Sequence, residues 1–330
     1  DTNGIGFNIP FPTGYAVPAN TVVDWGDNSS SVIPQGTETT SNDAFNHTYS
    51  QAGAYTITIT SGKATTKQQI LPMNFFSNRT GNNNAKKLVS MDTPLLNMDT
   101  RKLSDLFRNC SNLATIPDEL FDKNTTATDF EFCFQRCSTL KAIPEGLFNN
   151  NTAVTDFGYC FYDCNTLKAI PNGLFDNNTN VTSFNDCFYD CNTLAAIPKG
   201  LFDKNLAATD FGYCFGRCNT LAAIPEGLFD KNLAATNFSN CFYNCTKVKL
   251  NKNIFSTDGN YSRFKDKNMN FRYCFKAGNS AIDPGEAPEL WKYDKGSATW
   301  NTSDCFGNAR FTNKDGYTDE VASAWGTLKD

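Results

Sequence analysis

The feature that most constrains this chain is a repeat of 27 residues that runs without insertion through its middle. One cysteine marks each step, at Cys110, Cys137, Cys164, Cys191, Cys218 and Cys245. Around it stands the pattern Phe-x-x-Cys-Phe-x-x-Cys-x-x-Leu-x-x-Ile-Pro, written out in full from Phe157 to Pro171. Self-similarity at such a period predicts a solenoid, because a unit this small cannot bury its apolar face alone and must share a core with its neighbours.

Each unit is expected to form a short helix followed by a short strand. The apolar offsets i, i+3, i+4 and i+7 are those of an amphipathic helix, here at Phe157, Cys160, Phe161 and Cys164. Asp156 stands where a helix N-cap belongs, and Asn165 where the helix would end. Residues 166–170 are then expected to extend as a strand, and Pro171 to open a second, smaller turn.

The paired cysteines and the phenylalanine between them are the expected core of the repeat, at Cys133, Phe134, Cys137, Cys160, Phe161, Cys164, Cys187, Phe188, Cys191, Cys214, Phe215 and Cys218. We interpret the 13 cysteines of the chain as small buried thiols. Cysteines four apart on a helix have Cβ atoms about 5–6 Å apart, too far for a disulfide, and those on neighbouring helices would lie about 8–10 Å apart. Disulfides between repeats and a Cys-only zinc site are the alternatives; we expect neither a metal nor a cofactor.

The pattern Cys-Phe-x-x-Cys-x-x-Leu-x-x-Ile-Pro resembles the BspA-like leucine-rich repeats of bacterial surface proteins. The resemblance implies a curved α/β leucine-rich-repeat solenoid over residues 87–330. This chain departs from that family in the length of its repeat and in a Pro-x-Gly-Leu-Phe insert, which is similar to ordinary leucine-rich repeats. Regular repeats are expected over about 103–245, and degenerate repeats with a cap over 246–330, where Trp325 would pack over the end.

Residues 1–75 carry neither cysteine nor the 27-residue phase. Alternation over residues 54–60 and a turn cluster over 26–30 predict short strands and a small β-sandwich. The segments Trp25-Gly26-Asp27, His47-Thr48-Tyr49 and Gly53-Ala54-Tyr55-Thr56-Ile57 resemble the PKD domain, with Asn28 where that family has Gly. The resemblance implies an extracellular spacer. The Asn- and Gly-rich residues 76–86 are the expected junction.

Composition and charge limit the kinds of partner and the location that the chain can have. The formal net charge is −5 and no basic stripe appears, which argues against nucleic acid. No run of 18 apolar residues exists, so no membrane span is expected. The chain begins at Asp1 without a signal peptide, so a leader or a lipid anchor would stand on a removed or absent upstream segment. Abundant Asn, Thr and Ser favour an extracellular or outer-surface location, and we expect a monomer.

Two features bear on chemistry. His47 is the only histidine and lies in the PKD-like motif, so we interpret it as structural rather than as a catalytic base. Recurring aspartates such as Asp156 and Asp163 are interpreted as caps and solvated positions, although a glycosidase-like pair of carboxylates is an alternative. No phosphate-binding or dinucleotide-binding motif appears.

Tyrosines form the candidate recognition surface. On the expected helix, Tyr159 and Tyr162 face away from the core, and stacking would align equivalents into an outward ladder of Tyr159, Tyr162, Tyr189, Tyr213 and Tyr243. Exposed aromatic side chains are enriched at interfaces and stack on sugars. The alternative is that they fill gaps between neighbouring units. The strand face, at Lys141, Lys168, Ala195 and Ala222, is a second candidate surface.

The sequence therefore predicts a multidomain chain, with a PKD-like β-sandwich followed by a leucine-rich-repeat solenoid. Its expected function is non-catalytic binding or adhesion, with the solenoid contacting an unknown protein. Glycan capture by the tyrosine ladder is the alternative, and hydrolysis is the least favoured.

Overall fold

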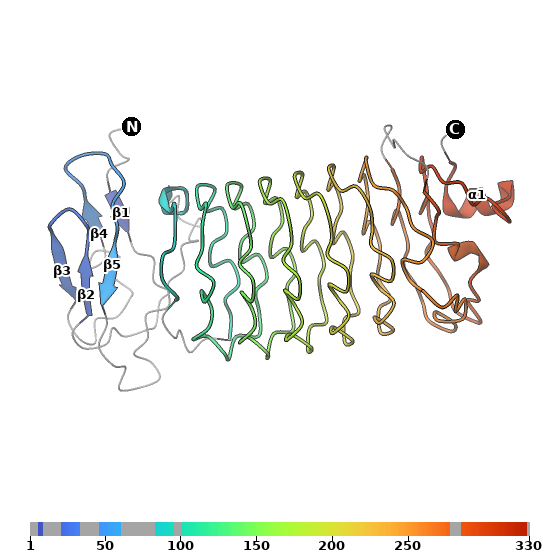
Figure 1. Cartoon of the computed structure of the whole chain (residues 1–330), viewed down its shortest axis with the longest axis horizontal. Coiled ribbons are helices and arrows are strands. Elements are labelled where there is room, and N and C mark those ends of the chain that lie inside the picture. The colour runs from blue at the N-terminus through green and yellow to red at the C-terminus, as the bar shows by residue number, and fades with distance from the viewer. Residues whose placement is uncertain are drawn as a thin grey trace.

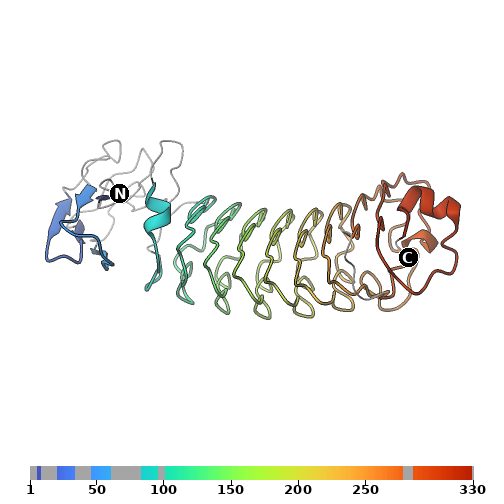
Figure 2. The ribbon, with the colours of Figure 1, turned by 90° about the horizontal axis from the view of Figure 1, so that it is seen from above.

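The computed structural model describes residues 6–8, 21–33, 46–60, 83–95, 101–277 and 285–328. Figures 1 and 2 show a row of coils stacked along the long axis, with small sheets at one end and helix α1 (Asp319–Trp325) at the other. Two 3₁₀ helices flank the row, η3 (Asn83–Lys87) and η4 (Leu290–Lys292). Residues 76–82 of the predicted junction lie outside the described residues.

The N-terminal part forms two small antiparallel sheets. β1 (Gly6–Asn8) pairs with β4 (Asn46–Thr48), and β2 (Thr21–Asp24) lies between β3 (Ser30–Ile33) and β5 (Thr58–Thr60). The strand expected over residues 54–60 is thus formed only at its end. Trp25 is 1% exposed, and its indole Nε1 donates to Ser31 Oγ at 2.9 Å. Trp25 is one of the buried apolar residues of the small sheets, together with Val23, Ile33 and Tyr49.

Parallel bridges join each coil to the next. On one side they connect Lys102, Asp129, Asp156, Ser183, Asp210 and Asn237 in steps of 27 residues. On another side they connect single pairs such as Ala169 and Ala196, so the strand predicted over 166–170 is reduced to an isolated bridge. The repeat found in the sequence is therefore the repeat of the backbone hydrogen bonding.

The helix predicted for residues 157–164 is wrong. This segment is a run of turns, which we call the turn ribbon: residues 156–164 and their equivalents 129–137, 183–191 and 210–218. The amides of Cys160 and Cys164 donate to the carbonyls three residues earlier, at 3.1 and 3.3 Å. Tyr159 and Asp163 have φ of 54° and 59°, the positive φ that a type II turn requires at its third residue. The solenoid is consequently not an α/β structure.

Hydrogen bonds between coils explain why turns replace the helix. The amides of Phe157, Tyr159, Phe161 and Asp163 all donate to carbonyls of the following coil, at 2.8 to 3.1 Å. The amide of Gly158, which lies between them, donates to Asp156 Oδ1 at 2.7 Å. Asp156 is therefore an Asx-turn residue rather than a helix N-cap. Each amide of the ribbon from 157 to 164 thus has an acceptor, as buried backbone requires.

The core is built of stacked phenylalanine columns. Phe134, Phe161 and Phe188 lie 5.3 and 5.4 Å apart between ring centroids, with their planes within 5° of parallel. All twelve predicted core residues are fully buried. All 13 cysteines are free and buried, and the Cys164 thiol donates to the Phe134 carbonyl at 3.2 Å. The distance of 8–10 Å expected between cysteines of neighbouring helices does not apply, because hydrogen-bonded coils are spaced by about 4.8 Å.

The remaining side of each coil contains a buried asparagine. The amide of Asn178 donates to the carbonyls of Phe148 and Asn151 in the preceding coil, at 3.1 and 2.9 Å. The column consists of Asn124, Asn151, Asn178, Asn205 and Asn232, all at most 1% exposed. Just before it, Gly173 has φ of 66° in the Pro-x-Gly-Leu turn, where the left-handed conformation favours glycine.

The coils become longer toward the C-terminus. The bridge step grows from 27 residues to 33 between Asn237 and Asn270 and to 31 between Asn270 and Asn301. Arg263 takes over from the buried asparagines, and its guanidinium donates to the Phe229 carbonyl at 2.8 Å. The last ribbon is covered by the end of α1, since the Phe306 amide donates to the Trp325 carbonyl at 2.7 Å. Trp325 is 8% exposed and packs against Phe306 and Trp300.

Candidate functional site

One continuous row of aromatic side chains lies on the turn ribbon, and we call it the aromatic strip: Phe132, Tyr159, Tyr162, Tyr189 and Tyr213. Phe132 stacks on Tyr159 with ring centroids 4.6 Å apart, and Tyr162 stacks on Tyr189 at 5.0 Å. Tilted and edge contacts join Tyr159 to Tyr162 at 5.7 Å and Tyr189 to Tyr213 at 5.8 Å. These rings are half-buried except Tyr213, which is 36% exposed.

The aromatic strip contains four of the five predicted tyrosines. Tyr243 is separate from it and pairs with Tyr273 at 6.4 Å. The strip ends because Gly216 and Asn240 occupy the next aromatic positions. A Cβ at Gly216 would lie 2.7 Å from the Tyr189 ring, so glycine leaves the room that this ring occupies.

Several of these aromatic residues adopt a backbone conformation that suits them poorly. The residues Phe132, Tyr159, Tyr213 and Tyr273 have φ between 54° and 60°. At the same position other coils carry Asp105, Asp186, Asn240 and Asp304. Asp and Asn tolerate the left-handed region, whereas a bulky residue there is uncommon. The fold therefore accepts a short polar residue at this position, whereas an aromatic residue there adds backbone strain.

Carboxylates surround the aromatic strip. Over the four ribbons from 129 to 218, seven acidic residues stand against Arg136 and Arg217, a net charge of −5 that equals that of the whole chain. The acidic residues are Asp129, Glu131, Asp156, Asp163, Asp186, Asp190 and Asp210. These four ribbons alone therefore carry a net negative charge as large as that of the whole chain.

Burial dominates the electrostatics of these groups. Asp186 is 6% exposed, and burial raises its pKa to about 6 although hydrogen bonds from Tyr159 and Asn185 oppose the rise. Burial and neighbouring carboxylates also raise the pKa of Glu131, and burial raises that of Asp156. The pKa of Tyr159 is raised to about 12, by burial and then by Asp186. The face thus holds negative charges at close quarters with little water around them.

Cations of the chain itself contact the strip. The Arg108 guanidinium lies 4.7 Å from the Phe132 centroid, and that of Arg217 lies 6.0 Å from Tyr189. Arg136 and Arg217 also approach Asp163 and Asp190, with N–O distances of 3.6 and 3.7 Å. Asp156, Asp186 and Asp210 form no ion pair with any described residue. Asp163 and Asp190 are thus compensated by arginines, whereas Asp156, Asp186 and Asp210 are not, within the described part of the chain.

The predicted strand face is exposed and carries only lysine and alanine side chains at the predicted positions. Lys141, Lys168, Ala195 and Ala222 occupy one position in four successive coils, and all four are exposed. Their backbone joins the coils, as when the Ala222 amide donates to the Ala195 carbonyl at 3.2 Å. Apart from the two lysines, this face offers few side-chain groups for recognition.

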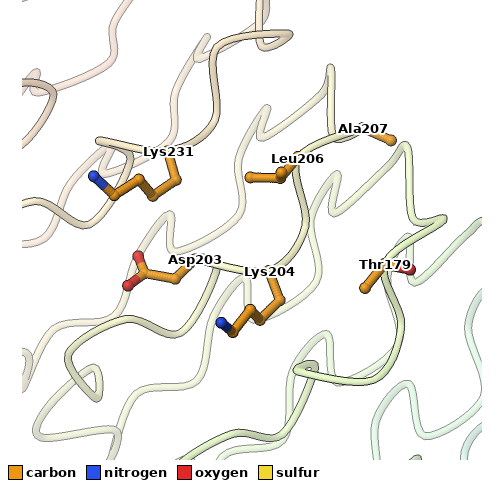
Figure 3. A pocket seen from close by; sticks show the side chains of 6 residues that line it. All are labelled: Thr179, Asp203, Lys204, Leu206, Ala207 and Lys231. Atoms are coloured by element: carbon orange, nitrogen blue, oxygen red, sulfur yellow. The ribbon is translucent and has the colours of Figure 1, made fainter.

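A hollow of about 610 Å³ lies on another side of the coils (Figure 3). Its lining residues are Thr179, Asp203, Lys204, Leu206, Ala207 and Lys231. Leu206 is 58% exposed and its equivalent Leu233 is 54% exposed, whereas the three preceding coils carry Thr at this position. Sequence reasoning missed this exposed apolar pair, which the break in the Thr column could have revealed. It also missed the buried asparagine column, whose recurrence every 27 residues was the available signal.

The N-terminal histidine is held in a structural arrangement. His47 Nε2 lies 2.7 Å from Asp27 Oδ2, and its ring stacks on Trp25 at 4.9 Å. Ser29 Oγ donates to Asp27 rather than to His47, so no nucleophile–base pair forms. Among the described residues, no group of three or more His, Cys, Asp or Glu side chains could hold a metal ion, and no helix is long and apolar enough to cross a membrane.

Comparison with known proteins adds little beyond the fold. No protein-family model and no curated protein matches the chain. Among solved structures it is similar to the Toll–Spatzle complex of Drosophila, with a TM-score of 0.29 and 14% identity over 68% of this chain and 31% of that chain. A leucine-rich repeat protein from Bacteroides ovatus gives a TM-score of 0.20 and 19% identity over 51% of this chain and 59% of that one.

A third similar structure is a leucine-rich cell surface protein from Faecalibacterium prausnitzii, with a TM-score of 0.14 and 13% identity over 62% of this chain and 78% of that chain. The chain spans about a third of the first of these proteins and about three fifths of the second. Such low TM-scores carry no argument about ligands. By its own architecture, the chain is a repeat solenoid with regularly spaced buried Asn, Cys and Phe and with small antiparallel sheets at its N-terminal end.

Proposed function

We propose that this chain is a non-catalytic binding protein of the bacterial surface or the extracellular space, and that its solenoid contacts a protein partner through the aromatic strip. The observation that carries the proposal is the aromatic side chain at positive φ in Phe132, Tyr159 and Tyr213, where other coils have Asp or Asn. The fold requires the positive φ at this position but not the aromatic side chain, and residues held in sparsely populated backbone conformations are concentrated at functional sites. Half-exposed tyrosines are, in addition, the residues most often found at protein interfaces.

Ring orientation favours a protein partner over a glycan. A sugar binds an aromatic platform through a free ring face, but Phe132 and Tyr159 each cover one face of the other, as do Tyr162 and Tyr189. The strip also carries tyrosine hydroxyl groups and is bordered by carboxylates. Such a surface provides hydrogen bonds and charge to a protein. The resemblance of the repeats to BspA-like surface proteins and the Asn- and Thr-rich composition support an extracellular location.

The test uses residues that the chain itself carries at the same positions in other coils. The variant combines Tyr159→Asn, Tyr162→Gln, Tyr189→Gln and Tyr213→Asn, after Asn240 and Gln135. Removing an aromatic pair costs about 0.5–1.5 kcal/mol, while Asn tolerates the positive φ at positions 159 and 213 better than Tyr does, as at Asn240, so the variant should remain folded. The strand-face variant Lys141→Ala with Lys168→Ala, after Ala195 and Ala222, is the matched control.

Binding is measured on immobilised extracellular-matrix proteins and on soluble glycans. We expect a matrix protein to bind the wild type and the strand-face control, and to lose binding to the folded aromatic-strip variant. Equal binding by all three proteins would place the contact elsewhere, and sugar binding that depends on the tyrosines would establish the glycan alternative.

A further inference from the structure

Within the aromatic strip, the column of aromatic residues at the Tyr159 position is interrupted at one coil. Tyr159, Asp186 and Tyr213 occupy the same position in three successive coils, with φ of 54°, 55° and 54°. Hydrogen-bonded coils are spaced by about 4.8 Å, so a group placed level with Asp186 would lie about 5 Å from each tyrosine column, within the roughly 6 Å reach of a cation–π contact. The interruption therefore places a carboxylate between two aromatic side chains.

The carboxylates nearest to Asp186 in the neighbouring coils have no cationic partner within the part of the chain that the structure describes. Asp156 and Asp210 stand in the coils on either side of the Asp186 coil, and their Oδ1 atoms accept the amides of Gly158 and Gly212 at 2.7 and 2.8 Å. Neither these carboxylates nor Asp186 has an ion-pair partner among the described residues. Asp186 accepts hydrogen bonds from Asn185 Nδ2 at 2.9 Å and from Tyr159, and neither donor carries a positive charge.

Glycines keep side chains short around this point. Gly158 and Gly212 flank Asn185 at the same position of their coils, where other coils carry Glu131 or Arg272. A Cβ at Gly212 would lie 2.8 Å from Asn185 Oδ1 and 3.1 Å from Asp210 Oδ1. Carboxylate and amide oxygens thus converge on the two glycines, with no long side chain from either of those residues above them.

The chain also shows which groups its tyrosines and phenylalanines accept. Arg108 lies on Phe132, Arg217 lies near Tyr189, and Arg272 lies 4.6 Å from the Tyr273 centroid. Each of these cations belongs to the same coil as its ring or to an adjacent one. Guanidinium groups therefore contact aromatic side chains in several coils, whereas Tyr159 and Tyr213 have no such contact with any described arginine.

We propose that the Asp186 coil receives an arginine or lysine side chain from a basic segment of a protein partner, between Tyr159 and Tyr213 and opposite Asp156 and Asp210. The inference rests on the proposed function, because it assigns the partner's chemistry to the same strip. Charge complementarity is the argument for this occupant: the four ribbons carry a net −5, and the two arginines present are already placed at Asp163 and Asp190. The cationic side chain would neutralise carboxylates that the fold holds partly buried.

The experiment measures binding of three hexapeptides to the full chain by fluorescence anisotropy: hexa-arginine, hexa-lysine and hexa-glutamate. We expect the two basic peptides to bind, hexa-arginine more tightly, and the acidic peptide not to bind. Affinity should fall as NaCl is raised from 50 to 300 mM, because partly exposed charges are screened.

The variants are matched in charge. Asp186→Asn and Asp156→Asn each remove one negative charge and follow Asn240 and Asn237, which occupy the same positions in other coils. Each should weaken hexa-arginine binding about tenfold, since a hydrogen bond to a charged group is worth at least that. The control Asp203→Asn removes the same charge from the exposed hollow on another side and should change binding less than twofold.

Three results would overturn the inference. An equal loss with Asp203→Asn would show that the peptides respond to net charge alone. Binding of hexa-glutamate, or of none of the peptides, would exclude a cationic partner. In each case the proposed function keeps its own test, because the matrix-protein screen with the aromatic-strip variant does not depend on peptide charge.

Discussion

Single residues on this solenoid combine a structural role with a strained environment. Position 159 and its equivalents require positive φ, which Asp and Asn supply easily and Tyr does not. At the same position Asp186 brings a carboxylate to 6% exposure with only polar neighbours as compensation. The candidate site is thus made of residues that the fold tolerates rather than needs.

Asp186 gives a pH-dependent prediction. Its pKa in the folded protein is about 6 against 3.8 ordinarily, so the native state holds the proton more tightly than the unfolded chain. The free energy of unfolding is therefore highest, as far as Asp186 determines it, below about pH 4. It falls as the pH rises through 6, by roughly 1–3 kcal/mol in total. Asp186→Asn should be more stable than wild type at pH 7.5 by that amount and equal to it at pH 4.

Urea unfolding at the two pH values measures this difference, and Asp203→Asn serves as the control because that carboxylate is exposed. An Asp186→Asn variant that is less stable at pH 7.5 would mean that the hydrogen bonds of the carboxylate outweigh its burial.

At the scale of elements, the turn ribbon is the main difference between expectation and structure. The offsets of Phe157, Cys160, Phe161 and Cys164 correctly indicated one buried face, and all four are fully buried. The same offsets fit both an amphipathic helix and two successive turns of four residues, so burial alone could not distinguish them. The available signal was the recurrence of Asp or Asn at two positions four apart, as at Asp186 and Asp190.

The asparagine column is expected to be a major source of stability within each coil. Asn178→Ala removes two buried hydrogen bonds to the preceding coil, at 3.1 and 2.9 Å, and should cost about 2–3 kcal/mol. Its exposed neighbour Asn177 makes one such bond at 3.2 Å, and Asn177→Ala should stay within about 0.5 kcal/mol. Denaturant midpoints of the two variants provide the comparison, and equal effects would contradict the assigned role.

The cysteine columns predict unreactive thiols. Burial raises the pKa of Cys164 and Cys191 far above that of a free thiol, so little thiolate forms at neutral pH. Native protein should resist alkylation for hours, whereas protein denatured without reductant should release most of its 13 thiols. Mass spectrometry after alkylation counts them, and six disulfides in the denatured sample would refute the buried-thiol interpretation.

At the scale of the whole molecule, the ends of the solenoid are where association with other molecules could begin. A stack of hydrogen-bonded coils terminates in unpaired amides and carbonyls that invite association. Here the end of α1 and the residues after it cover the last ribbon, with amides of Phe306 and Asn308 donating to the carbonyls of Trp325 and Thr327 at 2.7 and 2.8 Å. This is the terminal protection that repeat proteins need for solubility.

Deletion of residues 318–330 should therefore cause association. The deletion exposes the Phe306 ring contact with Trp325 and leaves the two amides without acceptors. Light scattering coupled to size-exclusion chromatography should show mass rising with protein concentration, while Ser323→Ala, an exposed change on α1, should behave as the intact chain. A truncated chain that stays monomeric would show that the last coil needs no cover.

The sequence alone determined the period of the solenoid and its buried positions, because the apolar residues recur every 27 residues. It also predicted that the cysteines would be free thiols. Only the tertiary structure decided what backbone carries that pattern. Coils spaced by parallel hydrogen bonds satisfy every amide from Phe157 to Cys164 through a neighbour or a turn, and a helix would have satisfied them internally. The same contacts between coils decided that Tyr159 stacks on Phe132, since positions 27 residues apart meet only when the coils are stacked.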